Sequence, residues 1–265
     1  MALNDYINDK PVIATQRLII RPMNAGDVPA LRKWLSDKSI YTYWGKGPSK
    51  DDRNPELMFE KQERPAKSFH LGMEEKQSGQ IIGDLWVYLI ENDRMASVAI
   101  RVSPACQNNG YGSEALGAII SFCFANTELQ RLWAQVDVRN LPCQRIMEKC
   151  GFTKEGLIRQ GKMVSSWCDY YIYGILKSDL SEAVSRISEM ERLFDLLSSH
   201  PEATDETRQA ARKLADYLDS GRWLADYQLD ELGMLPKQLK RGVLSQDGLY
   251  DLLGESDIKE LLREE

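Results

Sequence analysis

The sequence is poor in the two residue types that build disulfide scaffolds and zinc sites. Only five cysteines occur among 265 residues, an odd number with no C-x-x-C pair, and the histidines are limited to His70 and His200. The cysteines are Cys106, Cys123, Cys143, Cys150 and Cys168. This pattern argues against a disulfide framework and a structural zinc site, so we expect no bound metal. Free cysteines are also typical of a reducing cytoplasm.

Long hydrophobic runs are also missing. A membrane-spanning helix needs about 20 consecutive apolar residues, and no segment approaches that length. The first ten residues, MALNDYINDK, have neither a basic stretch followed by an apolar core nor a small-residue cleavage pattern. We therefore expect a soluble cytoplasmic protein that makes no membrane contact.

A basic surface is not indicated either. The formal net charge is -6, and the acidic excess lies in the last third of the chain: residues 180–265 hold 11 Lys+Arg against 19 Asp+Glu, and residues 1–179 hold 23 against 21. Nucleic-acid-binding domains usually carry a clustered basic face. We therefore expect no nucleic-acid partner.

Strand-like and helical segments alternate from about Ile13 to Lys177. Strands are predicted over RLIIRPM, SFHLGME, GQIIGDLWVYLI, SVAIRV, RLWAQVDV and YYIYGIL, and helices over DVPALRKWLSD, SEALGAIISFCFAN and LPCQRIMEKC. Gly151 follows the last of these helices and is typical of a helix stop. The pattern predicts an α+β fold with a mixed sheet.

Strand signals disappear from Leu180 onward. Asp179-x-x-Glu182 indicates a capping box that opens a helix, which Pro201 would end. A second helix over DETRQAARKLADYLDS would end at Gly221, before turns and short helical pieces. The sequence therefore predicts two domains, residues 1–178 and a small all-α domain over residues 179–265.

The stretch from Gln107 to Gly112, QNNGYG, follows a predicted strand and opens a predicted helix. The free N–H groups of a helix's first turn bind anions, and glycine lets a phosphate approach the backbone. Such residues also serve simply to turn the chain, so both interpretations stay open. Neither a Walker loop nor a G-x-G-x-x-G dinucleotide fingerprint fits, because no Gly-Lys pair precedes Ser or Thr and the glycines fall at 110, 112 and 117.

Two motifs in the same order resemble the GCN5-related N-acetyltransferases. Gln107-x-x-Gly110-x-Gly112 after the strand SVAIRV is similar to the family's Q/R-x-x-G-x-G/A loop. Asn140-x-x-Cys143, followed by EKCGF (148–152), is similar to its N-x-x-S/A and E-K-x-G-F elements. The strand start TQRL (15–18) resembles the branch that acetylates ribosomal-protein N-terminal alanine. The resemblance covers roughly residues 11 to 177.

The resemblance implies a centrally splayed sheet that holds acetyl-CoA as co-substrate and an amine as acceptor. A backbone N–H between Ile100 and Ser103 would stabilise the oxyanion, and Asn140 and Cys143 would lie along the coenzyme arm. The implied coenzyme-binding residues are Ile100, Val102, Gln107, Asn108, Asn109, Gly110, Tyr111, Gly112, Ser113, Asn140 and Cys143.

Proton transfer is the point at which the sequence departs from the family. Met147 stands where many relatives have the tyrosine that protonates the thiolate, and Ser97 where many have a glutamate. The remaining acid or base candidates are Asp84, His70, Asp169, Tyr171 and Tyr173. Each also has a structural explanation, since tyrosines pack well in strands and Asp84 follows a glycine turn.

The aromatic segment IYTYWGKGPSKDDRNPE (40–56) would line the acceptor site of this fold. Tyr41, Tyr43 and Trp44 either bind an amine by cation–π contact or form an apolar face that seats a helix. The sequence does not choose between a protein N-terminus, a lysine and a small amine.

The tail resembles a small all-helical family of unknown function, through the runs SGRWLADYQLDELGMLP and RGVLSQDGLYDLL within residues 220–253. It suggests a protein partner, recognition of the acceptor or a homodimer. Two alternatives to an N-acetyltransferase stay open: an acyl-CoA-binding module without catalysis, and an interaction protein dominated by the tail.

Overall fold

The computed structural model describes residues 2–7, 9–60, 68–199 and 202–263. The chain divides into two compact units, Met1–Lys177 and Ser178–Glu265. This division falls one residue before the boundary predicted from the sequence. That each unit is an independent domain stays a prediction, and the two are described separately below.

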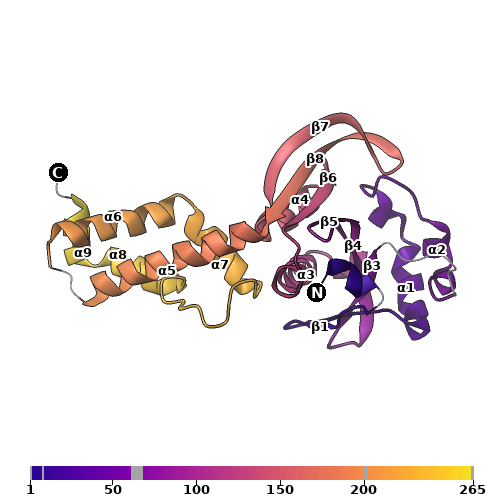
Figure 1. Cartoon of the computed structure of the whole chain (residues 1–265), viewed down its shortest axis with the longest axis horizontal. Helices are drawn as coiled ribbons and strands as arrows, with labels where there is room; N and C mark the ends of the chain where they lie inside the picture. Colours follow the sequence, from indigo (N-terminus) through magenta and orange to yellow (C-terminus); the bar gives the residue numbers. More distant parts are fainter. Residues whose placement is uncertain (1, 8, 61–67, 200–201, 264–265) are drawn as a thin grey trace. The chain divides into compact units, whose positions relative to one another are not determined.

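An eight-stranded sheet forms the centre of the first unit (Figure 1). The strands are β1 (Ile13–Ala14), β2 (Leu18–Arg21), β3 (Phe69–Glu75), β4 (Gln80–Glu91), β5 (Met95–Val102), β6 (Arg131–Asp137), β7 (Thr153–Met163) and β8 (Ser166–Leu176). Their order is β1-β2-β3-β4-β5-β6-β8-β7. Every neighbouring pair is antiparallel except β5 and β6, which are parallel.

The parallel pair separates halfway along the sheet. Met95–Ser97 of β5 pair with Arg131–Trp133 of β6, and no further pairing joins the two strands in the described chain. Both strands nevertheless continue, β5 to Val102 and β6 to Asp137. The result is a wedge that opens toward the ends of the two strands, and it confirms the predicted mixed, centrally splayed sheet.

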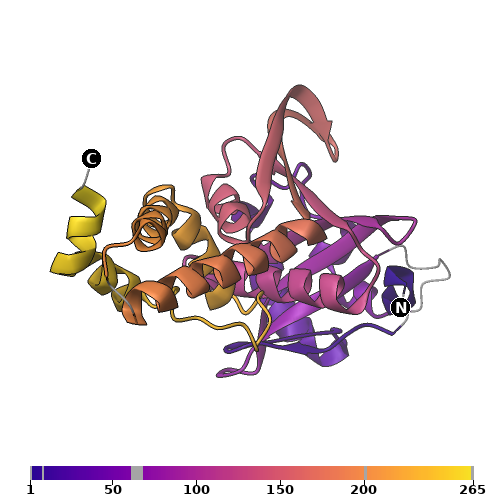
Figure 2. The same ribbon diagram turned by 60° about the vertical axis from the view of Figure 1, so that its left-hand side comes forward.

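One side of the sheet, the α3 face, is apolar and packs against two helices. These are α3 (Tyr111–Asn126), which lies along the sheet in Figure 2, and α4 (Leu141–Lys149). Alternate strand residues such as Leu85 and Ile100 point to this face. The buried side chains on the helices and strands include Leu71, Met73, Leu85, Val98, Leu116, Ile119 and Ile120. Burying each large apolar side chain contributes about 1.5–3 kcal/mol to folding.

The opposite side, the α1 face, carries α1 (Val28–Leu35) and short helical segments. Trp34 of α1 donates from Nε1 to the Ile81 carbonyl of β4 at 3.2 Å, which anchors the helix to the sheet. The other elements of the unit are α2 (Lys50–Arg53) and the 3-10 helices η1 (Leu3–Ile7), η2 (Ala25–Asp27), η3 (Lys38–Tyr41), η4 (Pro55–Met58) and η5 (Pro104–Cys106).

Strand β7 was not predicted from the sequence. Its segment TKEGLIRQGKM contains two glycines and four charged residues and lacks a regular alternation of apolar side chains. The strand exists because it pairs with β8 along most of its length, and the two form the long curved hairpin of Figure 1. It lies at the edge of the sheet, where charged residues and bulges limit unwanted pairing with other chains.

The second unit is helical, as predicted, but its helices begin and end elsewhere. They are α5 (Lys177–Ser199), α6 (Asp205–Asp219), α7 (Arg222–Glu231), α8 (Gln246–Gly254) and α9 (Ser256–Arg263). The capping-box interpretation of Asp179 is wrong, because α5 starts at Lys177 and Asp179 lies within its first turn. Helix α7 was missed: Gly221, with φ of 78°, ends one helix and caps the next. The break expected at Pro201 lies outside the described residues.

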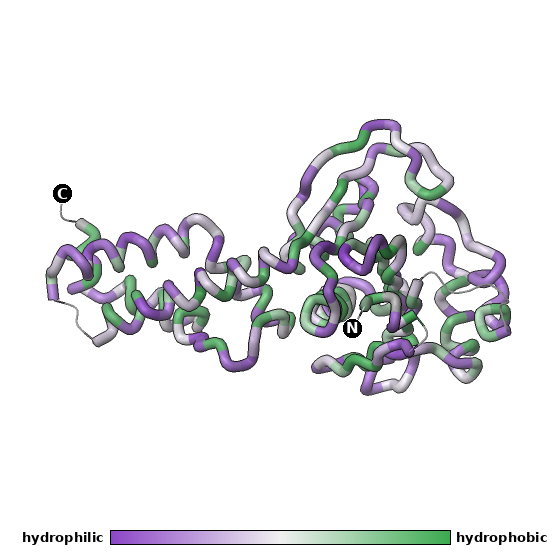
Figure 3. The backbone as a smooth tube through the Cα atoms, in the orientation of Figure 1, coloured by the Kyte–Doolittle hydropathy of each residue, from purple (hydrophilic) through white to green (hydrophobic). Residues whose placement is uncertain are grey.

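Apolar and polar residues alternate along α5 and α6, as Figure 3 shows, and the apolar sides form the core of the second unit. Its buried members include Ile187, Leu193, Leu214, Trp223, Leu249 and Ile258. Inside this core the fully buried Asp226 accepts hydrogen bonds from Arg186 at 2.5 and 2.8 Å and from the Tyr217 hydroxyl at 2.9 Å.

The sequence argued against a membrane-spanning helix and against a metal site. Within the described ranges, no helix is long and apolar enough to cross a bilayer. The same residues contain no cluster of His, Cys, Asp and Glu suited to a metal ion. The cytoplasmic location stays a prediction.

Candidate active site

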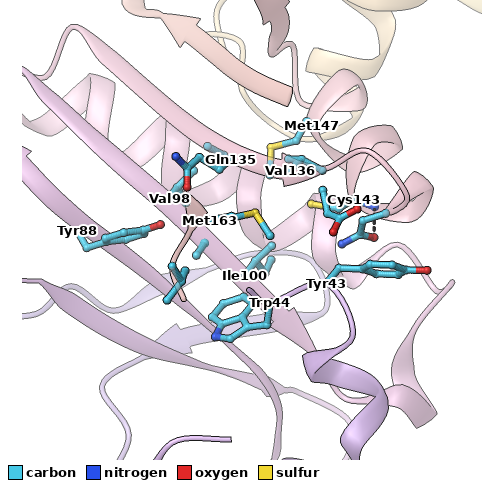
Figure 4. A pocket seen from close by; sticks show the side chains of 15 residues that line it. Tyr43, Trp44, Tyr88, Val98, Ile100, Gln135, Val136, Cys143, Met147 and Met163 are labelled. Atoms are coloured by element: carbon cyan, nitrogen blue, oxygen red, sulfur yellow. Dashed lines mark hydrogen bonds between the residues drawn. The ribbon is translucent and has the colours of Figure 1, made fainter. Parts of the chain in front are cut away.

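A pocket occupies the wedge between β5 and β6 (Figure 4). About 620 Å³ of empty space lies within it, part of which is open to solvent. Its lining residues are Tyr43, Trp44, Tyr88, Val98, Ala99, Ile100, Ala134, Gln135, Val136, Asp137, Asn140, Cys143, Met147, Met163 and Val164.

The pocket is lined by residues from both faces of the sheet. Val98, Ile100 and Val136 point to the α3 face, whereas Tyr88 and Gln135 point to the α1 face, because neighbouring residues of a strand alternate between faces. A cavity lined from both faces is possible only where two strands have lost their pairing. Two molecules can therefore approach one point from opposite sides of the sheet.

The strand edges along the wedge present unpaired backbone groups. Ser103 donates its backbone N–H to the Ile82 carbonyl of β4 at 2.7 Å. Because backbone groups of successive strand residues point to alternate sides, the N–H groups of Val102 and Ile100 point away from β4 and into the wedge, beyond the last residues that pair with β6. These amides need a partner. Ile100 and Val102, which the sequence nominated for the coenzyme, thus lie where a carbonyl of a ligand in the wedge would reach them.

The loop between β5 and α3 has the shape expected of an anion site. Asn108 and Gly110 adopt positive φ angles of 62° and 79°, and Gly110 is the N-terminal cap of the 16-residue α3. Such turns direct successive N–H groups to one point, and the helix dipole adds positive potential there. Tyr111, Gly112 and Ser113 form the first turn of α3.

Side chains of the loop hold its shape. Gln107 donates from Nε2 to the Val102 carbonyl at 3.1 Å, and Asn109 donates from Nδ2 to the Gln107 carbonyl at 3.0 Å. A Cβ atom on Gly112 would lie 2.9 Å from Cδ1 of Ile146, so glycine allows α3 and α4 to approach each other. The sequence-predicted loop residues are therefore brought together as one site.

A brace from the N-terminal strands supports this loop. Glu114 of α3 accepts hydrogen bonds from the Thr15 hydroxyl at 2.6 Å and from Nε and the backbone N–H of Arg17, both at 2.7 Å. Arg17 also donates to the Asn109 carbonyl at 2.8 Å and lies over the Tyr111 ring. Burial alone would raise the pKa of Glu114, but these hydrogen bonds outweigh it, so the pKa lies below its usual value.

Helix α4 contributes Asn140, Cys143 and Met147 to the pocket. Asn140 caps the helix by accepting the Cys143 backbone N–H at 3.2 Å through its side-chain oxygen, which leaves its Nδ2 group for a ligand. Burial raises the pKa of the Cys143 thiol to about 12, which keeps it protonated and unreactive. Met147, in place of the family's tyrosine, has no proton to donate.

Asp84 and His70 do not line the pocket but belong to a buried network behind it. Arg101, 3% exposed, donates to Asp84 at 2.7 and 3.0 Å and to Asp52 at 2.9 Å. Nε2 of His70 lies 3.0 Å from Asp84, and the imidazole stacks on Trp86 at 4.0 Å. The geometry gives Asp84 a structural role, and a catalytic role for either residue stays a prediction.

The three candidates on β8 also lie outside the pocket lining. Asp169 accepts the backbone N–H of Gln160 at 2.7 Å in the β7–β8 hairpin. Tyr173 is fully buried on the α3 face and donates to Glu148 at 3.0 Å; burial and this bond raise its pKa above the usual value. Tyr171 packs beneath the ammonium group of Lys154. The structure therefore does not bring these side chains to the wedge.

The aromatic segment divides between both of its interpretations. Tyr43 and Trp44 line the pocket, whereas Tyr41 is buried and donates its hydroxyl to the Leu35 carbonyl at 2.9 Å. The next residue, Gly45, joins the tip of the β7–β8 hairpin: its carbonyl accepts from the Ser165 backbone and hydroxyl at 3.1 and 3.0 Å.

Several lining residues were not predicted, because no local motif marks them. They are Tyr88, Val98, Ala99, Ala134, Gln135, Val136, Asp137, Met163 and Val164. Tyr88 was detectable in principle, since it lies four residues after Asp84 on a strand with period two and so shares its face.

Comparison with known proteins agrees with this geometry. The acetyltransferase (GNAT) domain family matches residues 17–153, and a domain of unknown function, DUF4298, matches residues 180–263. The uncharacterized N-acetyltransferase YnaD of Bacillus subtilis is 27% identical, over 63% of this chain and 98% of that protein.

Solved structures share the fold of the first unit. A GNAT-family acetyltransferase from Bacillus anthracis has a TM-score of 0.56 and 26% identity, over 63% of this chain and 99% of that one. Spermidine N-acetyltransferase from Vibrio cholerae, solved with CoA and spermine, has a TM-score of 0.54 and 22% identity. The match covers 62% of this chain and 98% of that one. The family model matches just over half of the chain, and the sheet is splayed as in the solved relatives, so the chain belongs to the GNAT acetyltransferases and is an acetyl-CoA-dependent N-acetyltransferase.

Proposed function

We propose that the chain transfers an acetyl group directly from acetyl-CoA to a primary amine, with the coenzyme on the α3 face and the amine on the α1 face. The observation that carries the proposal is the pocket lined from both faces of the sheet. A channel of this kind lets the amine nitrogen meet the thioester carbon without a covalent enzyme intermediate.

The coenzyme would be held by the residues that the sequence nominated. The diphosphate would accept hydrogen bonds from backbone N–H groups between Gln107 and Ser113. The arm would lie along the wedge-facing amides of β5, beside Asn140 and Cys143. Support comes from the positive φ angles of the loop and from the free edge of β5.

The chemistry needs a donor for the developing oxyanion and a proton for the departing thiolate. The wedge-facing N–H of Ile100 would supply the first, since a preorganised backbone donor stabilises charge at little reorganisation cost. Met147 has no proton to give and Cys143 is a weak acid. As the C–N bond forms and the C–S bond breaks, we assign to water in the pocket both the removal of the proton from the amine nitrogen and the protonation of the departing thiolate.

The proposed reaction does not by itself choose among the three classes of amine acceptor. A protein N-terminus, as in the ribosomal-protein branch that the TQRL strand resembles, a lysine and a small amine each present one nitrogen to the channel. Among relatives, the Vibrio cholerae enzyme is named for spermidine. The homodimer and a protein partner for residues 179–265 stay predictions.

The test is release of free thiol from acetyl-CoA with a panel of polyamines, alkylamines, peptides and aminoglycosides. Turnover that requires one of these amines supports the proposal. Calorimetric binding of coenzyme A with no thiol release across the panel would instead favour the acyl-CoA-binding module. Absence of coenzyme binding by the folded protein would overturn the assignment of the wedge.

A further inference from the structure

The lining of the pocket carries almost no charge. Of the described residues around it, only Asp137 has an ionised side chain at neutral pH. The others are aromatic, aliphatic, sulfur-containing or neutral amide residues. An amine that enters this pocket therefore leaves water for a surface with little charge of its own.

The charge of Asp137 is already compensated. Its carboxylate accepts hydrogen bonds from Arg139 at 2.6 and 2.9 Å and from the Arg139 backbone N–H at 2.9 Å, and the side chain is 2% exposed. The hydrogen bond from Arg139 also holds the pKa of Asp137 below its usual value, so the pair stays ionised. No lining carboxylate in the described chain is left to bind a second cation.

A positive group lies beside the lining residue Tyr43 instead. The Arg139 side chain is 65% exposed, and its guanidinium lies over the ring of Tyr43 at 5.7 Å. Figure 4 shows the Tyr43 hydroxyl pointing away from the other labelled side chains. The Arg139–Asp137 pair therefore offers a second ammonium group no net negative charge.

The α1 side of the pocket suits one amine. Tyr88, which points inward in Figure 4, and Gln135 lie on this face, and neither side chain makes a hydrogen bond to another described residue. Their oxygen atoms can accept the N–H groups of an amine. The rings of Trp44 and Tyr88 offer a weak attraction for a single cation.

We propose that the acceptor is a single amine borne on an uncharged, largely apolar group, bound on the α1 face by Tyr88 and Gln135, and that polyamines are poor acceptors. The inference rests on the proposed function and narrows its acceptor. It contrasts with the relatives named for spermidine, whose substrate carries further ammonium groups.

The test compares acceptors that differ by one ammonium group. Hexylamine and 1,6-diaminohexane form one pair, and the peptide amides Ala-Ala-Phe and Lys-Ala-Phe form another. For whichever pair is acetylated, we expect kcat/KM to favour the singly charged acceptor by roughly tenfold or more, because a buried cation without a partner is costly. Equal or better use of the doubly charged acceptor overturns the inference while leaving the proposed function intact.

Two substitutions and one control variant extend the test. Arg139→Gln frees the Asp137 carboxylate, so the ratio of kcat/KM for the singly charged acceptor to that for the doubly charged one should shrink by threefold or more. The control, Arg145→Gln, removes the same charge from an exposed position on α4 outside the lining and should leave this ratio unchanged.

Tyr88→Phe tests the amine site itself. It should raise KM for the amine severalfold and leave the affinity for coenzyme A the same. An Arg139 variant that keeps the wild-type ratio, or a Tyr88 variant with wild-type KM, counts against the assigned subsite. If no amine is acetylated although coenzyme A binds, the proposed function itself fails.

Discussion

Replacing Arg101 by methionine tests whether the buried network holds the α1 face together. The guanidinium joins β5 to β4 through Asp84 and to α2 through Asp52, and it lies within 4.6–5.8 Å of the ring centroids of four aromatic residues. Methionine keeps much of the apolar volume but leaves two carboxylates buried without a cation. We expect the first unit to lose stability rather than to change its fold.

The expected loss is about 3–5 kcal/mol, the usual cost of removing one partner from a buried ion pair. That is a large part of a net stability of about 5–15 kcal/mol. Urea unfolding followed by tryptophan fluorescence reports on this region, because Trp34, Trp44 and Trp86 surround the guanidinium. Arg145→Met, at an exposed position without an ion-pair partner in the described chain, should stay within about 0.5 kcal/mol of wild type.

The loss should depend on pH. Burial alone would raise the pKa of Asp52, but the charge of Arg101 and the bonds from Ser49 outweigh it, so the pKa lies below its usual 3.8. Its contribution in the wild type is complete above that value and is lost as the pH falls through the folded pKa. Without Arg101 the stranded carboxylates take up protons more readily, so the deficit should shrink from pH 7 toward pH 4. A deficit below about 1 kcal/mol at pH 7, or one independent of pH, would refute the reasoning.

Three further changes test other parts of the chain. Gly45→Ala places a Cβ atom 2.5 Å from the Met163 carbonyl oxygen at a φ of 74°, so thermal unfolding should show a loss of about 1–3 kcal/mol, whereas Gly47→Ala, with open space around it, should be neutral; equal melting temperatures would contradict this. Glu114→Gln weakens the loop brace, so it should cost about 1–3 kcal/mol of unfolding free energy at pH 7. The difference from wild type should shrink as the pH falls from 4.5 through the lowered pKa of folded Glu114, and a constant difference in urea titrations would count against the brace. Asp226→Asn leaves Arg186 without its buried partner, so unfolding of the second unit, followed through Trp223, should shift by about 2–4 kcal/mol; no shift would mean that the pair contributes nothing.

The parts of the candidate site that could be predicted from the sequence are those that depend on the local backbone conformation. Gly110 and Asn108 need positive φ angles, and Asn140 caps a helix, so glycine and asparagine mark these places directly. The order of the two motifs then placed both at the open end of one wedge. The fold class followed from the alternation of strands and helices.

The catalytic candidates could not be placed from the sequence, because their roles depend on distant partners. The sequence left Asp84 as a candidate acid or base. In the fold its carboxylate is bonded by Arg101, which also binds Asp52, and these two partners lie 17 and 32 residues away in the chain. Tyr88 and Gln135 line the same pocket only because of the register of the three strands β4, β5 and β6. Strand β7 depends in the same way on pairing with β8, which no local propensity encodes.

A pocket lined from both faces of one sheet has a kinetic consequence. In the proposed arrangement, acetyl-CoA and the amine bind on opposite faces, so both must be present at once and neither has to leave before the other arrives. Initial-velocity plots should therefore intersect rather than run parallel, and free coenzyme A should compete with acetyl-CoA but not with the amine.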